Sequence, residues 1–520
     1  MFCRVWSMVI HGVDAVPVQV EADVSDGMPF FTIVGYANTQ VREAQDRVRT
    51  ALRNLGIVLP PKRIVINLAP ADIRKNGAGF DLPIAAAVLQ AVGRIPPDSL
   101  EHMMMIGELG LNGEVRAVNG VLSSVMCAGK MGIKTCIIPW DNLPEGRQAG
   151  VQITVGIRNL RELVLFLSGD KERIRKESEE IQDREEEKKG NELTDFPDGD
   201  FSDILGQESV KRAALISACG FHNLLLVGPP GSGKSMTARR IPGILPPMSR
   251  EEQLEVTRLY SIAGLLPTGQ SLIRTRPFRA PHYSITAQAL AGGGRHPSPG
   301  EITLAHRGVL FLDELPEISR RVLEMLRQPL EERRILISRQ EGSYLFPAAF
   351  VLVAAMNPCP CGYYPDRSRC TCSEPEIAKY LGKISQAFLD RMDLCIEVPA
   401  VTYQTLIRGK EEKEGMTSQK MKAVVLRVRE IQSERYRGST IRFNGELGPE
   451  RIREICSLTP EAARMMEQAY HTLGLSARGY HRVLRTARTI ADIEDSEGID
   501  TSHLGEALCC RGMDKRNWRL

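Results

Sequence analysis

Eight residues in the middle of the chain have the types and the spacing of a phosphate-binding loop. The apolar run NLLLV is typical of a buried strand, and it is followed by GPPGSGKS and then by a segment typical of a helix start. Glycines in such a loop let backbone N–H groups converge on phosphate oxygens, and the helix N-terminus adds a favourable dipole. The spacing G-x-x-x-x-G-K-[ST] therefore predicts a nucleoside triphosphate site formed by Gly228, Pro229, Pro230, Gly231, Ser232, Gly233, Lys234 and Ser235.

A second buried strand is predicted at residues 309–312, in the stretch GVLFLDELPEI, and it ends in two adjacent carboxylates. Unpaired buried charges are expensive, so we expect these acids to have a partner. In proteins with this type of loop, a neighbouring strand delivers an aspartate to the magnesium ion of the bound ATP. We therefore predict that Asp313 and Ser235 hold Mg²⁺ and that Lys234 contacts the β- and γ-phosphates. Glu314, the next residue, is expected to polarise the attacking water.

The bulk properties narrow the class of protein. With 520 residues the chain is too long for one hydrophobic core, so several domains are expected. The net charge of +3 provides no overall attraction for nucleic acid, so a basic patch would have to be local. No stretch reaches the ~18 apolar residues of a membrane span, and the N-terminus lacks the features of a signal peptide. The sequence thus predicts a cytoplasmic protein with no membrane partner.

The chain divides by pattern into three folded parts and a linker. Residues 1–167 mix strand-like runs such as RIVINLAP with helix-like segments, which predicts an α+β domain. Residues 168–200 are dense in charges of both signs and poor in large apolar side chains, so they are expected to form a linker. Buried strands alternate with helices in residues 201–400, whereas residues 401–520 show only helical spacing. The predicted fold is a multidomain α/β protein with an α/β nucleotide-binding core and a helical C-terminal domain.

Adjacent Asp and Glu after an apolar run resemble the pattern of the AAA+ ATPases. Three further segments, LVAAMNP, FLDRMDL and LSARGYHRVLRTAR, are similar to other motifs of that family and follow in the same order. The resemblance implies that Asn357 holds the attacking water and that Arg391 is an arginine finger, supplied in trans to a neighbour's γ-phosphate. It also implies a phosphate contact by an arginine of the third segment, with Arg478 as the first choice and Arg482 or Arg485 as alternatives.

Residues 276–318 indicate a narrower family than the phosphate-binding loop does. They resemble the magnesium-chelatase-like branch of the AAA+ proteins and, more closely, the ComM/YifB family, and this resemblance covers essentially the whole chain. It implies a homo-hexameric motor that uses ATP and Mg²⁺ to move single-stranded or branched DNA, in recombination or natural transformation. A magnesium-chelatase-like ATPase that inserts a metal or remodels a partner is the alternative.

The segment EERRILISRQEGSYLFP predicts a β-hairpin just before the strand that ends at Asn357. In this branch of AAA+ proteins its tip, near 339–343, would face the central pore of a ring. Arg339 is then expected to bind DNA phosphate, and Arg333 and Arg334 add positive charge. The alternative is an ordinary solvated hairpin.

The N-terminal domain resembles the proteolytic domain of Lon proteases in the segments IRKNGAGFDLPIAAAVL and GELGLNGEVRAVNGVLSSVMCAGKMGIKTCIIP. Laid over that pattern, the positions of the nucleophilic serine and its lysine are occupied by Gly79 and Leu122. Neither side chain can perform acyl transfer. The resemblance therefore implies a Lon-like fold that is not a protease.

A cluster of cysteines, CPCGYYPDRSRCTC, follows Asn357. A disulfide framework is not expected in a reducing compartment. Four thiolates so close in sequence fit a tetrahedral Zn²⁺ site made by Cys359, Cys361, Cys370 and Cys372. The alternative is a tight loop of reduced cysteines, and either role is structural because the sequence shows no open ligand position.

Overall fold

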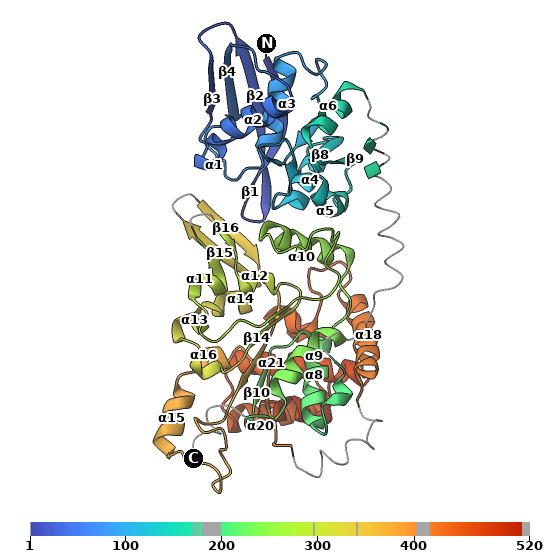
Figure 1. Ribbon diagram of the computed structural model, residues 1–520. Helices are drawn as coiled ribbons and strands as arrows, with labels where there is room; N and C mark the ends of the chain where they lie inside the picture. Colours follow the sequence, from blue (N-terminus) through green and yellow to red (C-terminus); the bar gives the residue numbers. More distant parts are fainter. Residues whose placement is uncertain are drawn as a thin grey trace.

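The computed structural model describes residues 2–169, 172, 174, 175, 177, 178, 199–294, 297–339, 342–401 and 416–511 (Figure 1). Most of the segment predicted as a linker, residues 168–200, lies outside the described residues. So do residues 340 and 341 of the predicted hairpin tip.

The N-terminal part is built on a seven-stranded mixed sheet with the order β3-β4-β2-β1-β5-β8-β9. Its strands are β1 (Phe2–His11), β2 (Asp14–Ser25), β3 (Phe30–Val34), β4 (Arg63–Ala69), β5 (Met103–Met105), β8 (Thr135–Pro139) and β9 (Ile153–Ile157), beside a small hairpin of β6 (Glu108–Leu109) and β7 (Val115–Arg116). Its helices are α1 (Thr39–Arg42), α2 (Ala44–Asn54), α3 (Asp81–Ala91), α4 (Val121–Lys130), α5 (Leu143–Arg147) and α6 (Leu160–Ser168). Met103 and Met105 pack with α2, α3 and α6, whereas Met104 packs with α4 and α5. Because side chains alternate along a strand, the sheet separates two layers of helices.

The central part is built on five parallel strands in the order β11-β14-β17-β10-β18. These are β10 (Leu224–Val227), β11 (Phe278–Arg279), β14 (Val309–Leu312), β17 (Val351–Met356) and β18 (Leu394–Glu397). Every residue of β10, β14 and β17 is buried. Leu224 and Leu226 pack with helices α8 (Glu208–Gly220) and α9 (Lys234–Ile244), whereas Leu225 and Val227 face the opposite layer. The prediction of strands covered on both faces is confirmed.

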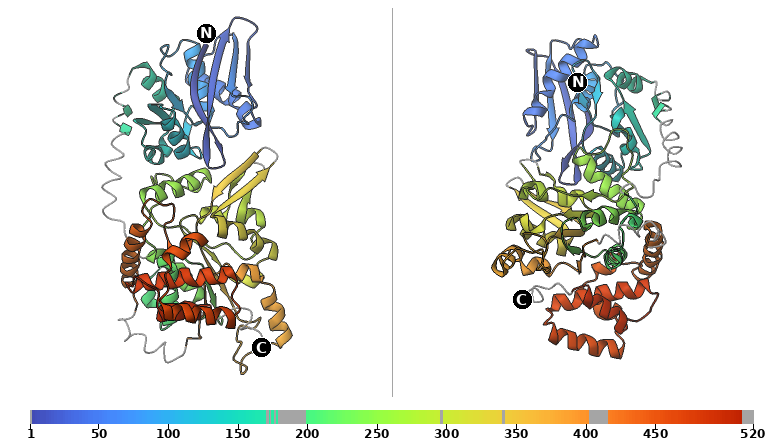
Figure 2. Two further views of the ribbon diagram at one scale, coloured as in Figure 1. Left: turned by 180° about the vertical axis from the view of Figure 1, so that it is seen from behind. Right: turned by 60° about the horizontal axis from the view of Figure 1, so that its bottom comes forward.

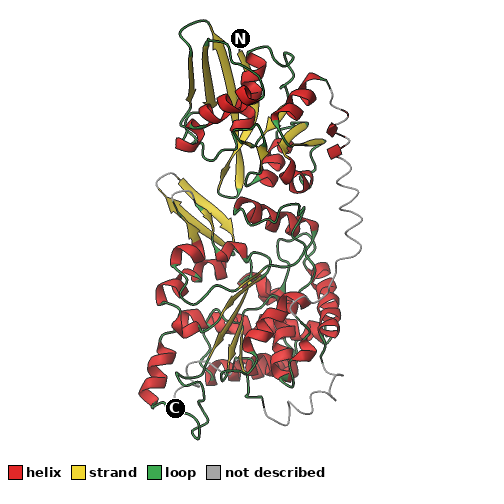
Figure 3. Ribbon diagram, viewed as in Figure 1, coloured by secondary structure: helices red, strands yellow, loops and turns green. Residues whose placement is uncertain are grey.

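Shorter elements surround this sheet (Figure 3). They are α10 (Arg250–Ile262), α11 (Ala287–Ala291), β12 (Gly292–Gly293), β13 (Ser298–Pro299), α12 (Glu301–Leu304), α13 (Arg320–Met325), α14 (Arg327–Glu332), α15 (Glu374–Gly382) and α16 (Gln386–Leu389). The predicted hairpin is present as β15 (Arg334–Arg339) and β16 (Gly342–Pro347), with Arg339 opposite Gly342. It projects towards the N-terminal part (Figure 1), where the rings of His11 and Tyr344 lie 4.4 Å apart.

The described residues of the C-terminal part, 416–511, form helices and no strand. The helices are α18 (Ser418–Arg435), α19 (Pro449–Ile455), α20 (Pro460–Thr472), α21 (Ala477–Ile493) and α22 (Thr501–Cys509). They share a hydrophobic core with α8 and α9 and lie against the central sheet at the end of the molecule far from the N-terminal part (Figure 2). The chain is therefore a multidomain α/β protein with a parallel-sheet core and a helical C-terminal part. In the part of the chain that the structure describes, no helix combines the length and the apolar character required to cross a membrane.

Helix α10 links the N-terminal part to the central part. Its Arg258 donates hydrogen bonds to the carbonyl of Val13 at 2.8 Å and to Asp14 at 2.9 Å. Towards the end of the helix, Ser261 accepts a hydrogen bond from the backbone N–H of Gly120 at 3.1 Å. The helix is thus attached to two separate segments of the N-terminal part.

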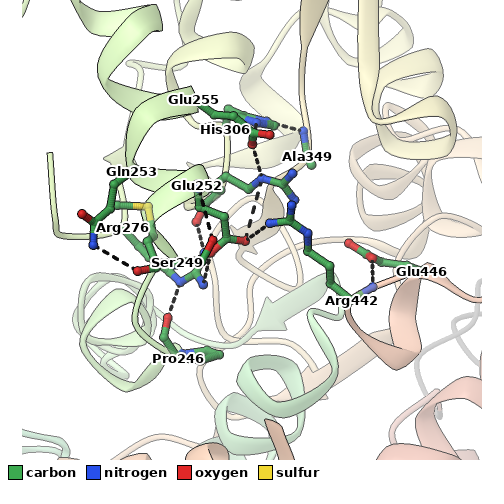
Figure 4. A network of polar contacts seen from close by, with 12 residues as sticks. Pro246, Ser249, Glu252, Gln253, Glu255, Arg276, His306, Ala349, Arg442 and Glu446 are labelled. Atoms are coloured by element: carbon green, nitrogen blue, oxygen red, sulfur yellow. Dashed lines mark hydrogen bonds and ion pairs between the residues drawn. The ribbon is translucent and has the colours of Figure 1, made fainter. Parts of the chain in front are cut away.

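The first turn of α10 is held by a buried ionic network (Figure 4). Glu252 is 4% exposed and contacts Arg276 at 3.2 Å and Arg442, from the C-terminal part, at 2.7 Å. Burial lowers the pKa of Arg276 to about 10, and the charge of Glu252 partly offsets this effect. One carboxylate therefore joins three segments that are far apart in the sequence.

A second carboxylate extends the network to the start of β14 (Figure 4). Glu255 contacts His306 at 3.2 Å and Arg307 at 2.9 Å. The other ring nitrogen of His306 accepts the N–H of Ala349, so the Nε2–H donates to Glu255. Burial opposes the ionisation of Glu255, but His306 and Arg307 outweigh burial and lower its pKa to about 2.

We expect Glu252→Gln to destabilise the protein by about 3–5 kcal/mol, because the substitution leaves buried guanidinium groups without their carboxylate. Thermal unfolding would measure the change. The neighbouring Glu251 is exposed and is absent from this network, so Glu251→Gln serves as the matched control and should change stability by less than about 0.5 kcal/mol. Equal melting temperatures for the two variants would contradict the structural importance of the network.

Candidate active site

The predicted phosphate-binding loop connects β10 to α9 at the carboxyl edge of the central sheet. Gly231 and Gly233 have φ values of +73° and +93°, in the left-handed region that glycine tolerates. β14 and β17 end at the same edge because all strands of the sheet are parallel. The topology therefore places Asp313 and Asn357 beside the loop, at the edge where open α/β sheets bind ligands.

Lys234 lies at the centre of this loop. Its Nζ donates to the carbonyl oxygens of Gly228 at 2.7 Å and Pro229 at 2.8 Å, and to Oδ1 of Asn357 at 3.2 Å. Burial lowers its pKa, and the negative charge of Asp313 opposes that shift. The lysine thus links the loop to the end of β17.

The predicted magnesium ligands are also brought together. Oγ of Ser235 donates to Oδ2 of Asp313 at 2.7 Å. Hydroxyl and carboxylate oxygens are ligands that Mg²⁺ prefers, and the ion usually takes only one or two protein carboxylates beside phosphate and water. The donor set at the end of β14 therefore fits a magnesium ion that arrives with a nucleotide.

Glu314 occupies a strained position next to Asp313. Its φ of +49° is unusual for a residue with a side chain, and its N–H donates to Oδ1 of Asp313 at 2.9 Å. The side chain is exposed and lines a cavity of about 380 Å³ together with Asn357, Tyr380 and Lys383. The carboxylate and the amide thus border the same space, where a water could be held between them.

The predicted arginine finger lies at the opposite edge of the sheet. The carbonyl of Arg391 accepts a hydrogen bond from Asn223, the residue before β10, whereas the loop begins after β10 at Gly228. The five residue steps from Asn223 to Gly228 separate these ends by about 16 Å. Arg391 is only 3% exposed, and its guanidinium contacts Glu331 at 2.6 Å. Within one chain the structure does not bring Arg391 to the loop.

The three candidate arginines of α21 differ in their surroundings. Arg478 is exposed and lies 3.7 Å from Glu331, which also pairs with Arg391. Arg482 is buried, and it donates to the carbonyl of Arg391 and to Asp393, both at 2.7 Å. Nε of Arg485 is buried and has no hydrogen-bond partner among the described residues. Of the three, Arg478 is the one with a solvent-exposed guanidinium near Arg391.

Sequence reasoning missed Glu331, which holds both Arg391 and Arg478. It lies on α14 in the run LEERR, whose two glutamates and two arginines give no indication of its partners. The only available signal was its position at the start of the segment predicted as a hairpin.

The predicted cysteine cluster is assembled. The four Sγ atoms of Cys359, Cys361, Cys370 and Cys372 lie within 4.8 Å of one another. Cys359 is 3.3 Å from Cys361 and 3.8 Å from Cys370, and Cys361 is 3.6 Å from Cys370. A Zn–S bond of ~2.3 Å in a tetrahedron separates sulfur atoms by roughly 3.8 Å, so the spacing fits a Cys₄ zinc site.

The cysteine loop packs against the phosphate-binding loop. A Cβ placed on Gly362 would lie 2.6 Å from Cδ of Pro230 and 3.8 Å from Cγ of Asn357. No side chain larger than hydrogen fits there without movement of Pro230. The cysteine loop therefore forms part of the wall of the candidate site.

The structure places the predicted DNA-contacting arginines in different surroundings. Arg339 is exposed at the end of β15. Its Nη2 lies beside Gly293, so close that a Cβ added to that glycine would be only 2.7 Å away. Arg334 is exposed at the other end of the strand. Arg333 instead pairs with Glu446 of the C-terminal part at 3.1 Å, so its charge is directed away from the hairpin tip.

Three family models match the chain. The model "Magnesium chelatase, subunit ChlI" matches residues 200–406, "Subunit ChlI of Mg-chelatase" matches 20–142, and "Magnesium chelatase, subunit ChlI C-terminal" matches 415–511. The 38 kDa magnesium-chelatase subunit of Rhodobacter capsulatus is 27% identical over 30% of this chain and 50% of its own length.

Two relatives match almost from end to end. Competence protein ComM of Haemophilus influenzae is 43% identical over 98% of this chain and 97% of its own length. YifB of Escherichia coli (strain K12) is 42% identical over 97% of this chain and 96% of its own. The chain therefore belongs to the ComM/YifB family, and it carries the magnesium-chelatase-like domains that the family models describe.

Proposed function

We propose that this protein is an AAA+ ATPase that works as a homo-hexameric motor on single-stranded or branched DNA. The observation that carries the ATPase part is the meeting of Ser235 with Asp313 and of Lys234 with Asn357 at one edge of the sheet. The division of the chain that we propose is a Lon-protease-like domain at 1–167, a linker at 168–200, the AAA+ core at 201–400 and a helical lid at 401–520.

Each residue of this site has a distinct part in hydrolysis. The backbone of the loop and Lys234 bind the phosphates of ATP, and Ser235 and Asp313 hold the Mg²⁺ that accompanies it. Glu314 takes up the proton of the attacking water while Asn357 orients that water towards the γ-phosphate. Little covalent chemistry is required of the protein, so positioning and charge dominate the rate.

Arg391 and Arg478 act on the site of a neighbouring subunit. Both contact Glu331 on the side of the sheet opposite the loop, and in this position neither lies beside the γ-phosphate site of its own chain. In a ring, that edge of one subunit faces the loop of the next. An arginine that leaves Glu331 for a neighbour's phosphate exchanges one anionic partner for another.

The choice of DNA as the substrate comes from the near-complete match to a competence protein and from the hairpin. Leu336 and Leu345 are paired and about half exposed on its outer face, and Arg334 and Arg339 are exposed at the two ends of β15. Apolar surface beside exposed cations suits a strand with stacked bases and charged phosphates. Proteolysis is not part of the proposal, because Gly79 and the buried Leu122 occupy the positions of the Lon serine and lysine.

A magnesium-chelatase-like ATPase that inserts a metal or remodels a partner is the second candidate. The three matching family models favour it. An ATPase rate indifferent to DNA would distinguish it from a DNA motor.

We expect the purified protein to separate the strands of a labelled three- or four-way junction in the presence of ATP and Mg²⁺. Glu314→Gln should bind ATP but hydrolyse it about 10²- to 10⁴-fold more slowly and release no product strand. Arg339→Ala should weaken junction binding and reduce its salt dependence, whereas Arg464→Ala, an exposed arginine of α20, should not. Rings that hydrolyse ATP but neither bind nor move any branched DNA would refute the DNA motor and favour the second candidate.

Arg391→Ala is expected to bind ATP and to lose about 10³- to 10⁵-fold in hydrolysis, as removal of a trans arginine does in related NTPases. Mixing this variant with Lys234→Ala should restore part of the ATPase rate, because some interfaces then combine an intact loop with an intact arginine. Native mass spectrometry would establish that the rings are mixed. Mixed rings with no recovered activity would argue against a role between subunits.

We also propose that the cysteine cluster binds Zn²⁺ through Cys359, Cys361, Cys370 and Cys372. Protein prepared without a metal-affinity tag should contain about one zinc per chain by elemental analysis. Cys372→Ser should lower that content, whereas Cys127→Ser, a half-buried cysteine of α4, should leave it unchanged. Folded, reduced protein with almost no zinc would support the alternative of a loop of free thiols.

A further inference from the structure

A groove at the junction of the N-terminal part and the hairpin has the lining of a nucleotide-binding site. It encloses about 550 Å³, and His11, Tyr36, Arg74, Asn76 and Tyr344 line it. These residues come from the end of β1, the turn after β3, the loop after β4 and the strand β16. Aromatic rings, a guanidinium and an amide thus converge from four segments.

Tyr36 is held in an outward position by the backbone. Its φ of +50° is unusual for a large side chain, and 56% of the residue is exposed. The N–H of Lys75 donates to the carbonyl of Tyr36 at 3.2 Å, and the carbonyl of Lys75 accepts from Asn38 at 3.1 Å. A strained residue kept in place by hydrogen bonds on both sides is a feature of ligand-binding sites.

Asn76 supplies an independent indication of a ligand. Its Oδ1 is buried and has no hydrogen-bond partner among the described residues. A buried acceptor without a donor is unfavourable, so a ligand that donates a hydrogen bond would be stabilised there. The imino N–H groups of thymine and guanine and the exocyclic amines of adenine, cytosine and guanine are such donors.

The geometry points to a site for one base and the adjoining phosphate of single-stranded nucleic acid. The base stacks on Tyr36 and donates to Asn76, and Arg74 contacts the phosphate. The assignment rests on the proposed DNA motor, because the wall formed by Tyr344 belongs to the hairpin that we propose to contact DNA. It adds a contact on the N-terminal part, so that the strand is held on both sides of the junction.

The groove is less suited to a peptide. Peptides that lie along a sheet pair with an exposed strand edge. Of the strands that border this groove, β1 and β2 are interior strands with a neighbour on each side, whereas β16 of the two-stranded hairpin contributes the side chain of Tyr344. Asp72 also lines the groove. Its carboxylate would repel any phosphate other than the one in contact with Arg74.

Fluorescence anisotropy of a labelled oligothymidylate and of a matched strand with abasic residues tests the site in the full-length protein with a non-hydrolysable ATP analogue. The wild type should bind the strand with bases about 5- to 100-fold more tightly than the abasic strand. Tyr36→Ala and Asn76→Ala should lose most of this preference, whereas Tyr36→Phe should retain it because the ring still stacks. Phe30→Ala, which removes an exposed aromatic ring of β3 outside the groove, is the matched control and should behave as the wild type.

The possible failures are distinguishable. If the wild type binds both strands equally, or if Tyr36→Ala keeps the full preference, this site is refuted while the DNA motor stands. If the wild type binds neither strand and moves no junction, both are refuted. A labelled unfolded peptide provides the second arm: if Tyr36→Ala weakens peptide binding and leaves DNA binding unchanged, the groove is a peptide site and the inference is wrong.

Discussion

The carboxylate of Asp313 at the end of a strand buried on both faces is the constraint on which the rest of the central part depends. Asp313 is half-buried, and the hydroxyl of Ser235 in the neighbouring loop partners its carboxylate at 2.7 Å. This contact requires β14 and β10 to end at the same level of one sheet. The parallel strand order meets that requirement by placing only β17 between them, and β17 in turn brings Asn357 to Lys234.

The two ends of the parallel strands carry different groups. The carboxyl ends gather Lys234, Ser235, Asp313 and Asn357, whereas the amino ends gather arginines around Glu331 and Asp393. Because the two ends of the strands are about 16 Å apart, the structure does not place these arginines beside the loop of their own chain. In the ring that we propose, each complete site is therefore shared by two subunits.

Sequence reasoning predicted the parts that depend on local pattern. The phosphate-binding loop, the acid pair and the buried strands are contiguous in the chain, and their types and spacing follow from what a loop or a strand can do. The hairpin and the closeness of the four cysteines were predicted for the same reason. Contacts between distant segments were not legible: the ion pair of Glu252 with Arg442 links residues 190 apart, and nothing around either residue indicates the other. The sequence also left open which arginine of α21 is free, because burial by other segments makes that distinction.

The attachments of the N-terminal part bear on how it can move relative to the central part. Helix α10 is anchored by the Glu252 network at its first turn and holds the N-terminal part through Arg258 and Ser261 nearer its end. Its 13 residues span about 20 Å, so the helix is a rigid connection between the two parts. The rings of His11 and Tyr344, tilted by 31° to each other, give a second contact on the hairpin. Because the two contacts lie on different elements of the central part, a movement of the hairpin relative to α10 would change the orientation of the N-terminal part.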